Sequence, residues 1–125
     1  MEDIKIKVEI EVSITQEDID DIMSTALEGG INYWCKKVEV DGDYLGEYAS
    51  EQISRGGNLK LYDSEDDKVY KLTREKLVEG VRKYLADSNK PYNILDENSI
   101  DCCMVDAEVA DMIIQYAVFG YVIYG

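Results

Sequence analysis

The N-terminal residues alternate strictly between apolar and polar side chains. Isoleucine or valine occupies every even position from Ile4 to Ile14, and charged or hydroxyl side chains occupy the positions between them. Because successive side chains of a strand point to opposite faces, this pattern predicts a long, half-buried strand of an antiparallel sheet over 4–14. The lysine and glutamate side chains of its polar face also suit an edge or partner-facing position.

Three later stretches have helical spacing and recognisable starts. Thr15, Thr73 and Asp106 each stand immediately before such a stretch and are suitable N-caps. The apolar residues after each cap recur every three or four positions and are expected to face the core. The expected buried stripes of the first two helices are Ile19, Ile22, Met23, Ala26 and Leu27, and Leu77, Val78, Val81, Tyr84 and Leu85. The apolar residues of the third helix are Val109, Met112, Ile113, Tyr116 and Ala117.

Two glycine pairs, at 29–30 and 56–57, are expected to end helices in the left-handed conformation. The second pair would end a short helix over 48–55. Strands are then predicted over 33–40, 58–62, 68–72 and 121–124, and the middle two flank an acidic turn as a hairpin.

Together these elements predict a single α+β domain over 1–125. We expect a mainly antiparallel sheet of about four to six strands with three to four helices packed on it. A chain of 125 residues is long enough to bury a hydrophobic core. Its hydrophobic content of 46% excludes a disordered acidic tail.

The chain is strongly acidic, with 27 acidic and 13 basic residues and a net charge of −14. Direct nucleic-acid binding and attachment to anionic membranes both need a cationic surface, so we expect neither. No apolar run approaches the roughly 20 residues of a membrane helix, and the N-terminus lacks the features of a signal peptide. We therefore expect a cytoplasmic protein, in which the charge serves solubility, nucleic-acid mimicry or inhibition of a basic partner.

The residue types give little support for catalysis. The chain has no histidine, which removes histidine bases, histidine-activated nucleophiles and most zinc or iron sites. Its three cysteines lack the spacing of a metal or redox motif, and Cys35 is expected to be a buried apolar side chain. We therefore predict a protein that is not an enzyme and has no catalytic residues, metal site or cofactor.

The aromatic residues are unusual, with ten tyrosines and one tryptophan against a single phenylalanine. Tyrosine and tryptophan combine a ring with a hydrogen-bond donor, so they suit a core, an oligomer interface or stacking on a nucleobase. With neighbouring amides, a hydroxyl and arginines, they form our predicted ligand-binding set. That set comprises Asn32, Tyr33, Trp34, Ser54, Arg55, Arg74, Gln115, Tyr116 and Phe119.

The two arginines of this set each have a second interpretation. Arg55 could bind a phosphate, or it could complement the dipole at the end of its helix. Arg74 lies in the first turn of a helix, where a cation opposes the dipole. It would either help Thr73 and free N–H groups to hold an anion, or pair with Glu75 or Asp111.

Three blocks, at 26–35, 48–57 and 111–120, resemble a family of small proteins from phages and prophages of Gram-positive gut bacteria. Members of this family carry no assigned activity, so no residue roles are transferred. The resemblance implies a phage accessory protein in the cytoplasm of an infected cell. Proteins of that kind often counter host defence by enclosing a nucleotide-derived immune signal or by blocking a defence protein.

Two functions follow as expectations. The first is an anti-defence sponge that binds a small nucleotide-derived signal, such as a cyclic ADP-ribose derivative or a cyclic nucleotide, without turning it over. A homo-oligomer would allow pockets between subunits, although the acidic charge counts against an anionic ligand. The alternative is an acidic inhibitor or nucleic-acid mimic whose helix around 17–28 blocks a basic host defence protein. A carboxylate-based nuclease or phosphodiesterase has no supporting motif.

Overall fold

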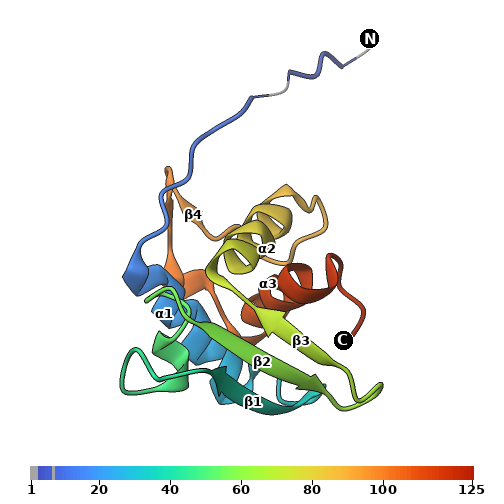
Figure 1. Cartoon of the computed structure of the whole chain (residues 1–125). Coiled ribbons are helices and arrows are strands. Elements are labelled where there is room, and N and C mark those ends of the chain that lie inside the picture. The colour runs from blue at the N-terminus through green and yellow to red at the C-terminus, as the bar shows by residue number, and fades with distance from the viewer. Residues whose placement is uncertain (1–2, 7) are drawn as a thin grey trace.

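The computed structural model describes residues 3–6 and 8–125, and it has an α+β architecture (Figure 1). Its elements in chain order are α1 (Gln16–Thr25), η1 (Ala26–Gly30), β1 (Cys35–Asp41), η2 (Ala49–Glu51), β2 (Asn58–Asp63), β3 (Val69–Leu72), α2 (Arg74–Ala86), β4 (Leu95–Asp96), β5 (Ser99–Ile100), η3 (Cys102–Met104) and α3 (Ala107–Phe119). The α+β class is therefore confirmed.

The predicted sheet is smaller than expected. The main sheet is antiparallel in the order β1-β2-β3, and β4 and β5 form a separate two-stranded hairpin. The predicted hairpin on either side of the acidic turn is confirmed as β2 and β3. Leu59 and Leu61 of β2 are buried on the face towards the helices, whereas Lys60 on the other face lies within ion-pair distance of Glu39 and Asp41.

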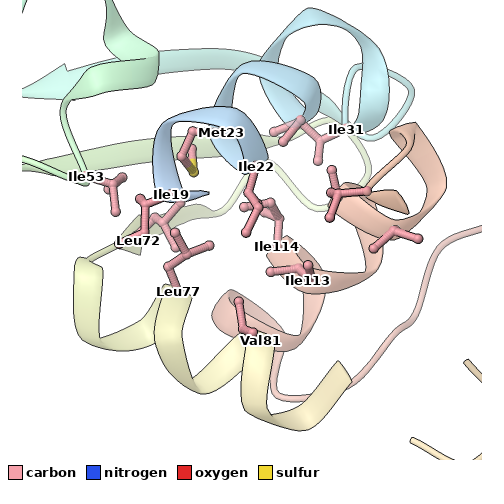
Figure 2. Close-up of a cluster of buried hydrophobic side chains, with 14 of the residues drawn as sticks. Ile19, Ile22, Met23, Ile31, Ile53, Leu72, Leu77, Val81, Ile113 and Ile114 are labelled. Atoms are coloured by element: carbon pink, nitrogen blue, oxygen red, sulfur yellow. The ribbon is translucent and has the colours of Figure 1, made fainter. Parts of the chain in front are cut away.

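The core lies between the sheet and the three α-helices. Figure 2 shows side chains of α1, α2 and α3 meeting there, among them Ile22, Leu77 and Ile113, which are all fully buried. Helices α2 and α3 are in close contact at Gly80, where an added Cβ would lie 2.4 Å from the backbone oxygen of Ile113. A glycine is needed there because no larger residue leaves room for that contact.

All three predicted helix starts are confirmed by their hydrogen bonds. Thr15 and Asp18 form a reciprocal capping box, with N···O distances of 2.9 and 3.0 Å. The Thr73 hydroxyl accepts from the N–H of Lys76 at 3.1 Å, and the Asp106 carboxylate accepts from the first turn of α3 at 2.9 Å. At the other end of α3, Gly120 takes a left-handed conformation with φ of 84°.

The predicted strand over 4–14 is wrong for the residues that the structure describes; Lys7 lies outside them. The first described residues of this segment lead away from the helices and sheet (Figure 1), whereas Val8 to Ile14 lie nearer to α2. Ile4 is 90% exposed and Ile6 is 81% exposed. Near its end, the N–H of Ser13 donates to Asn98 at 2.7 Å. An alternating pattern determines which side chains share a face of a strand, but it does not provide a neighbouring strand. A strand needs such a neighbour for its backbone hydrogen bonds.

Smaller predictions also need correction. Residues 121–124 form no strand, and η2 is a single 3₁₀ turn in place of the helix expected over 48–55. Neither Gly29 nor Gly30 is left-handed: Gly29 is extended, and Gly30 is buried where a Cβ would lie 2.9 Å from a backbone oxygen of α3. Gly56 does take the expected conformation, with φ of 90°. Val78 is 41% exposed and does not belong to the buried stripe of α2.

Candidate functional site

The predicted ligand-binding residues separate into two groups and two isolated positions. Tyr33, Trp34, Gln115 and Phe119 gather between the start of β1 and helix α3. A second group, of Ser54, Arg55 and Arg74, lies where η2, α1 and α2 approach one another. Asn32 is exposed beside the first group. Tyr116 faces the end of α2, where its hydroxyl donates to Asp87 at 2.7 Å.

The first group is organised around the buried carboxylate of Asp111. The indole N–H of Trp34 donates to Asp111 at 2.7 Å, and the Gln115 amide donates to the same oxygen at 2.9 Å. The Tyr33 hydroxyl donates to the other carboxylate oxygen. Burial, followed by this carboxylate, raises the pKa of Tyr33 far above its ordinary value. The Asp111 carboxylate therefore accepts hydrogen bonds from three side chains. Tyr33 and Trp34 precede β1, and Gln115 lies one turn further along α3.

The same network holds the C-terminal residues. The Gln115 side-chain oxygen accepts from the N–H groups of Ile123 and Tyr124 at 2.8 and 2.9 Å. The Tyr124 hydroxyl donates to Asp63 at 2.8 Å, and desolvation together with this carboxylate raises its pKa to about 12. Side-chain hydrogen bonds therefore replace the strand pairing that was expected over 121–124.

This arrangement leaves little of the first group open to a ligand. Trp34 is 1% exposed and Gln115 is fully buried. The ring of Trp34 packs against Phe119 at a centroid distance of 5.2 Å and stacks on Tyr124 at 5.7 Å. A nucleobase could stack on Trp34 only if the core opened. The packing and hydrogen bonds of this group therefore indicate that its residues stabilise the fold.

The second group borders a cleft between α1 and α2, with a volume of about 460 Å³. This volume is within the usual range for small-molecule sites. Ser54 and Arg74 line it together with residues that were not in the predicted set, namely Ile14, Gln16, Ile19, Glu75 and Val78. The exposure of Val78 follows from this position, because its side chain faces the cleft and not the core.

Arg74 is the only arginine with no ion pair among the residues that the structure describes. Arg55 pairs with Glu51 at 3.2 Å, and Arg82 pairs with Glu79. The expected alternative for Arg74, a pair with Glu75 or Asp111, is wrong. Its guanidinium instead makes a long contact of 3.5 Å with the backbone oxygen of Ser54. Most of its five donors are therefore available to an anion.

The cleft combines a cationic end with an apolar wall. Arg74 stands in the first turn of α2, where backbone N–H groups lack acceptors within the helix. The isoleucines and Val78 provide the apolar wall, and Gln16 adds an amide. Glu75 is the opposing charge. Such a site suits a ligand with a flat apolar ring and an anionic group. The apolar part of the lining was not predicted from the sequence, because Ile14 was assigned to a strand.

Groups suited to covalent or metal chemistry do not gather at the cleft. Burial raises the pKa of Cys35, and burial with the nearby Asp18 raises that of Cys102 to about 12, so both are poor nucleophiles at neutral pH. Within residues 3–6 and 8–125, no three His, Cys, Asp or Glu side chains are placed to hold a metal ion.

The charge is distributed unevenly along the chain and over the fold. Residues 8–35 contain seven acidic and no basic residues, and residues 91–125 contain six acidic and no basic residues. These two stretches contact each other through η1, α1 and α3. None of their carboxylates is in an ion pair within the part of the chain that is described. This side of the protein is therefore strongly negative.

Comparison with known proteins adds no assignment: no family model, curated protein or solved structure matches the chain. Within the described residues, none of the helices has the length and apolar character to cross a membrane.

Proposed function

We propose that this protein is a non-enzymatic binding protein that sequesters a small nucleotide-derived ligand in the cleft between α1 and α2. The observation that carries the proposal is that the Arg74 guanidinium, which has no ion pair among the described residues, lines a cleft together with apolar side chains. A phosphate would contact Arg74 and the first turn of α2, and a base would lie against the wall of Ile19 and Val78. The expected ligands are cyclic nucleotides and cyclic ADP-ribose derivatives.

This proposal moves the ligand away from most of the predicted aromatic residues. Trp34 and Gln115 support the fold, whereas Ser54 and Arg74 keep the binding role. The absence of histidine fits binding without turnover, because a sponge needs no general base. In a phage-infected cell, as the family resemblance implies, removal of such a signal would weaken a host defence.

The test is a thermal shift and calorimetric titration with a panel of cyclic nucleotides and ADP-ribose derivatives. A ligand at about 100 times its Kd should add roughly 2.7 kcal/mol of stability. Arg74→Ala removes charge-assisted hydrogen bonds and should weaken binding by roughly 10- to 100-fold. Arg82→Ala is the matched control, since it removes the same charge from the same helix and should bind normally. Equal affinity of Arg74→Ala and the unmodified protein would refute the assignment of the site.

A second candidate is an acidic inhibitor of a basic protein, supported by the adjacent base-free stretches at 8–35 and 91–125. Carboxylates without internal ion pairs are available to a partner's lysines and arginines. This candidate predicts that affinity for a purified basic partner falls steeply with salt. Glu17→Lys with Asp21→Lys should weaken that binding strongly, while the same reversal at Glu65 and Asp66, on the β2–β3 turn, should not.

A further inference from the structure

The N-terminal arm, which we define as the described residues 3–6 and 8–14, exposes an unusual amount of apolar surface. Its side chains Ile4, Ile6, Val8 and Ile10 are 90, 81, 75 and 56% exposed. They lie on one side of an extended chain, because they alternate with charged residues. Four neighbouring aliphatic side chains in water are costly, and a row of this kind usually marks an interaction surface.

An apolar groove runs beside the arm. The arm residues Val8, Ile10, Val12 and Ile14 form one wall of the groove. The other wall is helix α2 with Leu95, contributing Val78, Val81, Leu85, Ala86 and the aliphatic part of Arg82. The volume between them is about 460 Å³. The arm of a single chain therefore lies near α2 without filling the space, and further apolar side chains fit between them.

The sequence of the arm is complementary to itself. When two arms run antiparallel with Val8 opposite Val8, Ile6 faces Ile10 and Ile4 faces Val12 on the apolar side. On the polar side, Lys5 faces Glu11. The sequence also sets Lys7, which lies outside the described residues, opposite Glu9.

The neighbouring registers also pair apolar residues, but each of them sets like charges opposite each other. A shift of two residues in one direction sets Glu9 opposite Glu9, and a shift in the other sets Asp3 opposite Glu11. Like charges directly opposite each other destabilise a strand pair. Only the register centred on Val8 sets each of the two lysines opposite a glutamate, and it also pairs the apolar residues from Ile4 to Val12 with one another.

We infer that the occupant of this surface is a second copy of the chain, whose arm pairs antiparallel with the first, centred on Val8. The apolar side of the two-stranded ribbon packs into the groove against α2, which it needs because an isolated two-stranded ribbon is only marginally stable. The ribbon supplies the strand partner that the alternating pattern requires and that the described residues of the single chain provide only at Ser13. The inference does not require a ligand at Arg74, although Ile14 and Val78 line both the cleft and the groove.

Disulfide trapping tests the register directly, in a chain in which the exposed Cys103 is replaced by serine. Val8→Cys sets two thiols opposite each other and should give a covalent dimer quickly under mild oxidation. Ile4→Cys is the matched control on the same face, because its two thiols would be about 26 Å apart along the ribbon. Equally fast cross-linking of both variants, or none at Val8→Cys, would overturn the inference.

Charge exchange provides a second test with its own rescue. Lys5→Glu or Glu11→Lys sets like charges opposite each other twice per dimer, and each should weaken dimerisation by roughly 2- to 30-fold. Combining both changes restores opposite charges and should restore the dimer, as measured by sedimentation over a range of concentrations. A protein that stays monomeric at all concentrations, or a double variant as weak as the single ones, would contradict the inference.

Discussion

Replacing Asp111 with alanine removes the acceptor at the centre of the buried network. Three donors point at this carboxylate: the indole of Trp34, the amide of Gln115 and the hydroxyl of Tyr33. They respond differently to its loss. Tyr33 is 54% exposed and can bond to water, and Gln115 keeps a contact of 3.2 Å with the backbone oxygen of Tyr124. Trp34 is 1% exposed, and its indole N–H donates to no other acceptor among the described residues.

These differences determine how much stability the Asp111→Ala substitution is expected to cost. An unsatisfied buried donor costs about 1–3 kcal/mol, which applies to Trp34, and the weakened bonding of Gln115 adds about 1 kcal/mol. We therefore expect Asp111→Ala to lower the free energy of unfolding by about 2–4 kcal/mol, a large part of the roughly 5–15 kcal/mol of a typical domain. Asp111→Asn keeps one acceptor oxygen for Trp34 and should cost less than alanine.

The assay is urea unfolding followed by the fluorescence of Trp34, which is the only tryptophan and moves from the core into water. The midpoint should fall while the slope with denaturant stays the same. Glu47→Ala removes an exposed loop carboxylate and should change stability by no more than about 0.5 kcal/mol. An Asp111→Ala protein as stable as the Glu47→Ala control would refute the structural role of the network.

Three further outcomes are expected. Gly80→Ala places a Cβ 2.4 Å from a backbone oxygen of α3 and should destabilise the protein by about 1–3 kcal/mol in urea unfolding, whereas Gly29→Ala meets nothing within 4 Å and should be nearly neutral. The hydrogen bond to Asp87 raises the pKa of Tyr116 to about 12. The stability that this hydrogen bond contributes is therefore fully present below the ordinary tyrosine pKa near 10, and it is lost as the pH rises through about 12. Unfolding at a series of pH values should show Tyr116→Phe about 1 kcal/mol less stable at pH 8, with the difference vanishing above pH 12. Cys103 is exposed, while the other two thiols have raised pKa values, so Ellman's reagent at pH 8 should modify one thiol rapidly and the others only on unfolding.

The elements whose signals are local could be predicted from the sequence. Thr15, Thr73 and Asp106 each form the cap that their neighbours implied, because capping bonds join residues only three positions apart. The hairpin of β2 and β3 likewise depends on two adjacent runs and the turn between them. Periodicity identified most buried positions of α2, but Val78 was wrong because the width of a helix's buried stripe depends on what packs against it.

Features that depend on distant residues could not be predicted. The alternation of the arm is the same whether its partner is in the chain or in another copy. The pattern therefore could not reveal that, among the described residues, the arm has a bridge partner only at Ser13. Asp111 joins Trp34 across most of the sequence, and no local pattern distinguishes buried carboxylates such as Asp111 and Asp63 from the many exposed ones. The cleft depends on Ser54 and Arg74 lying close together. The sequence indicated only that both residue types suit ligand binding, and not that they are neighbours in the fold.

The most direct test of the proposed sequestration is a native mass spectrum of the protein incubated with each member of the nucleotide panel, before and after heat release. The account predicts one ligand mass bound per chain, recovered unchanged on heating, and lost in Arg74→Ala but not in Arg82→Ala. A spectrum with no bound compound from the panel, or a ligand recovered with altered mass, would contradict the claim that this protein holds a nucleotide-derived ligand without turning it over.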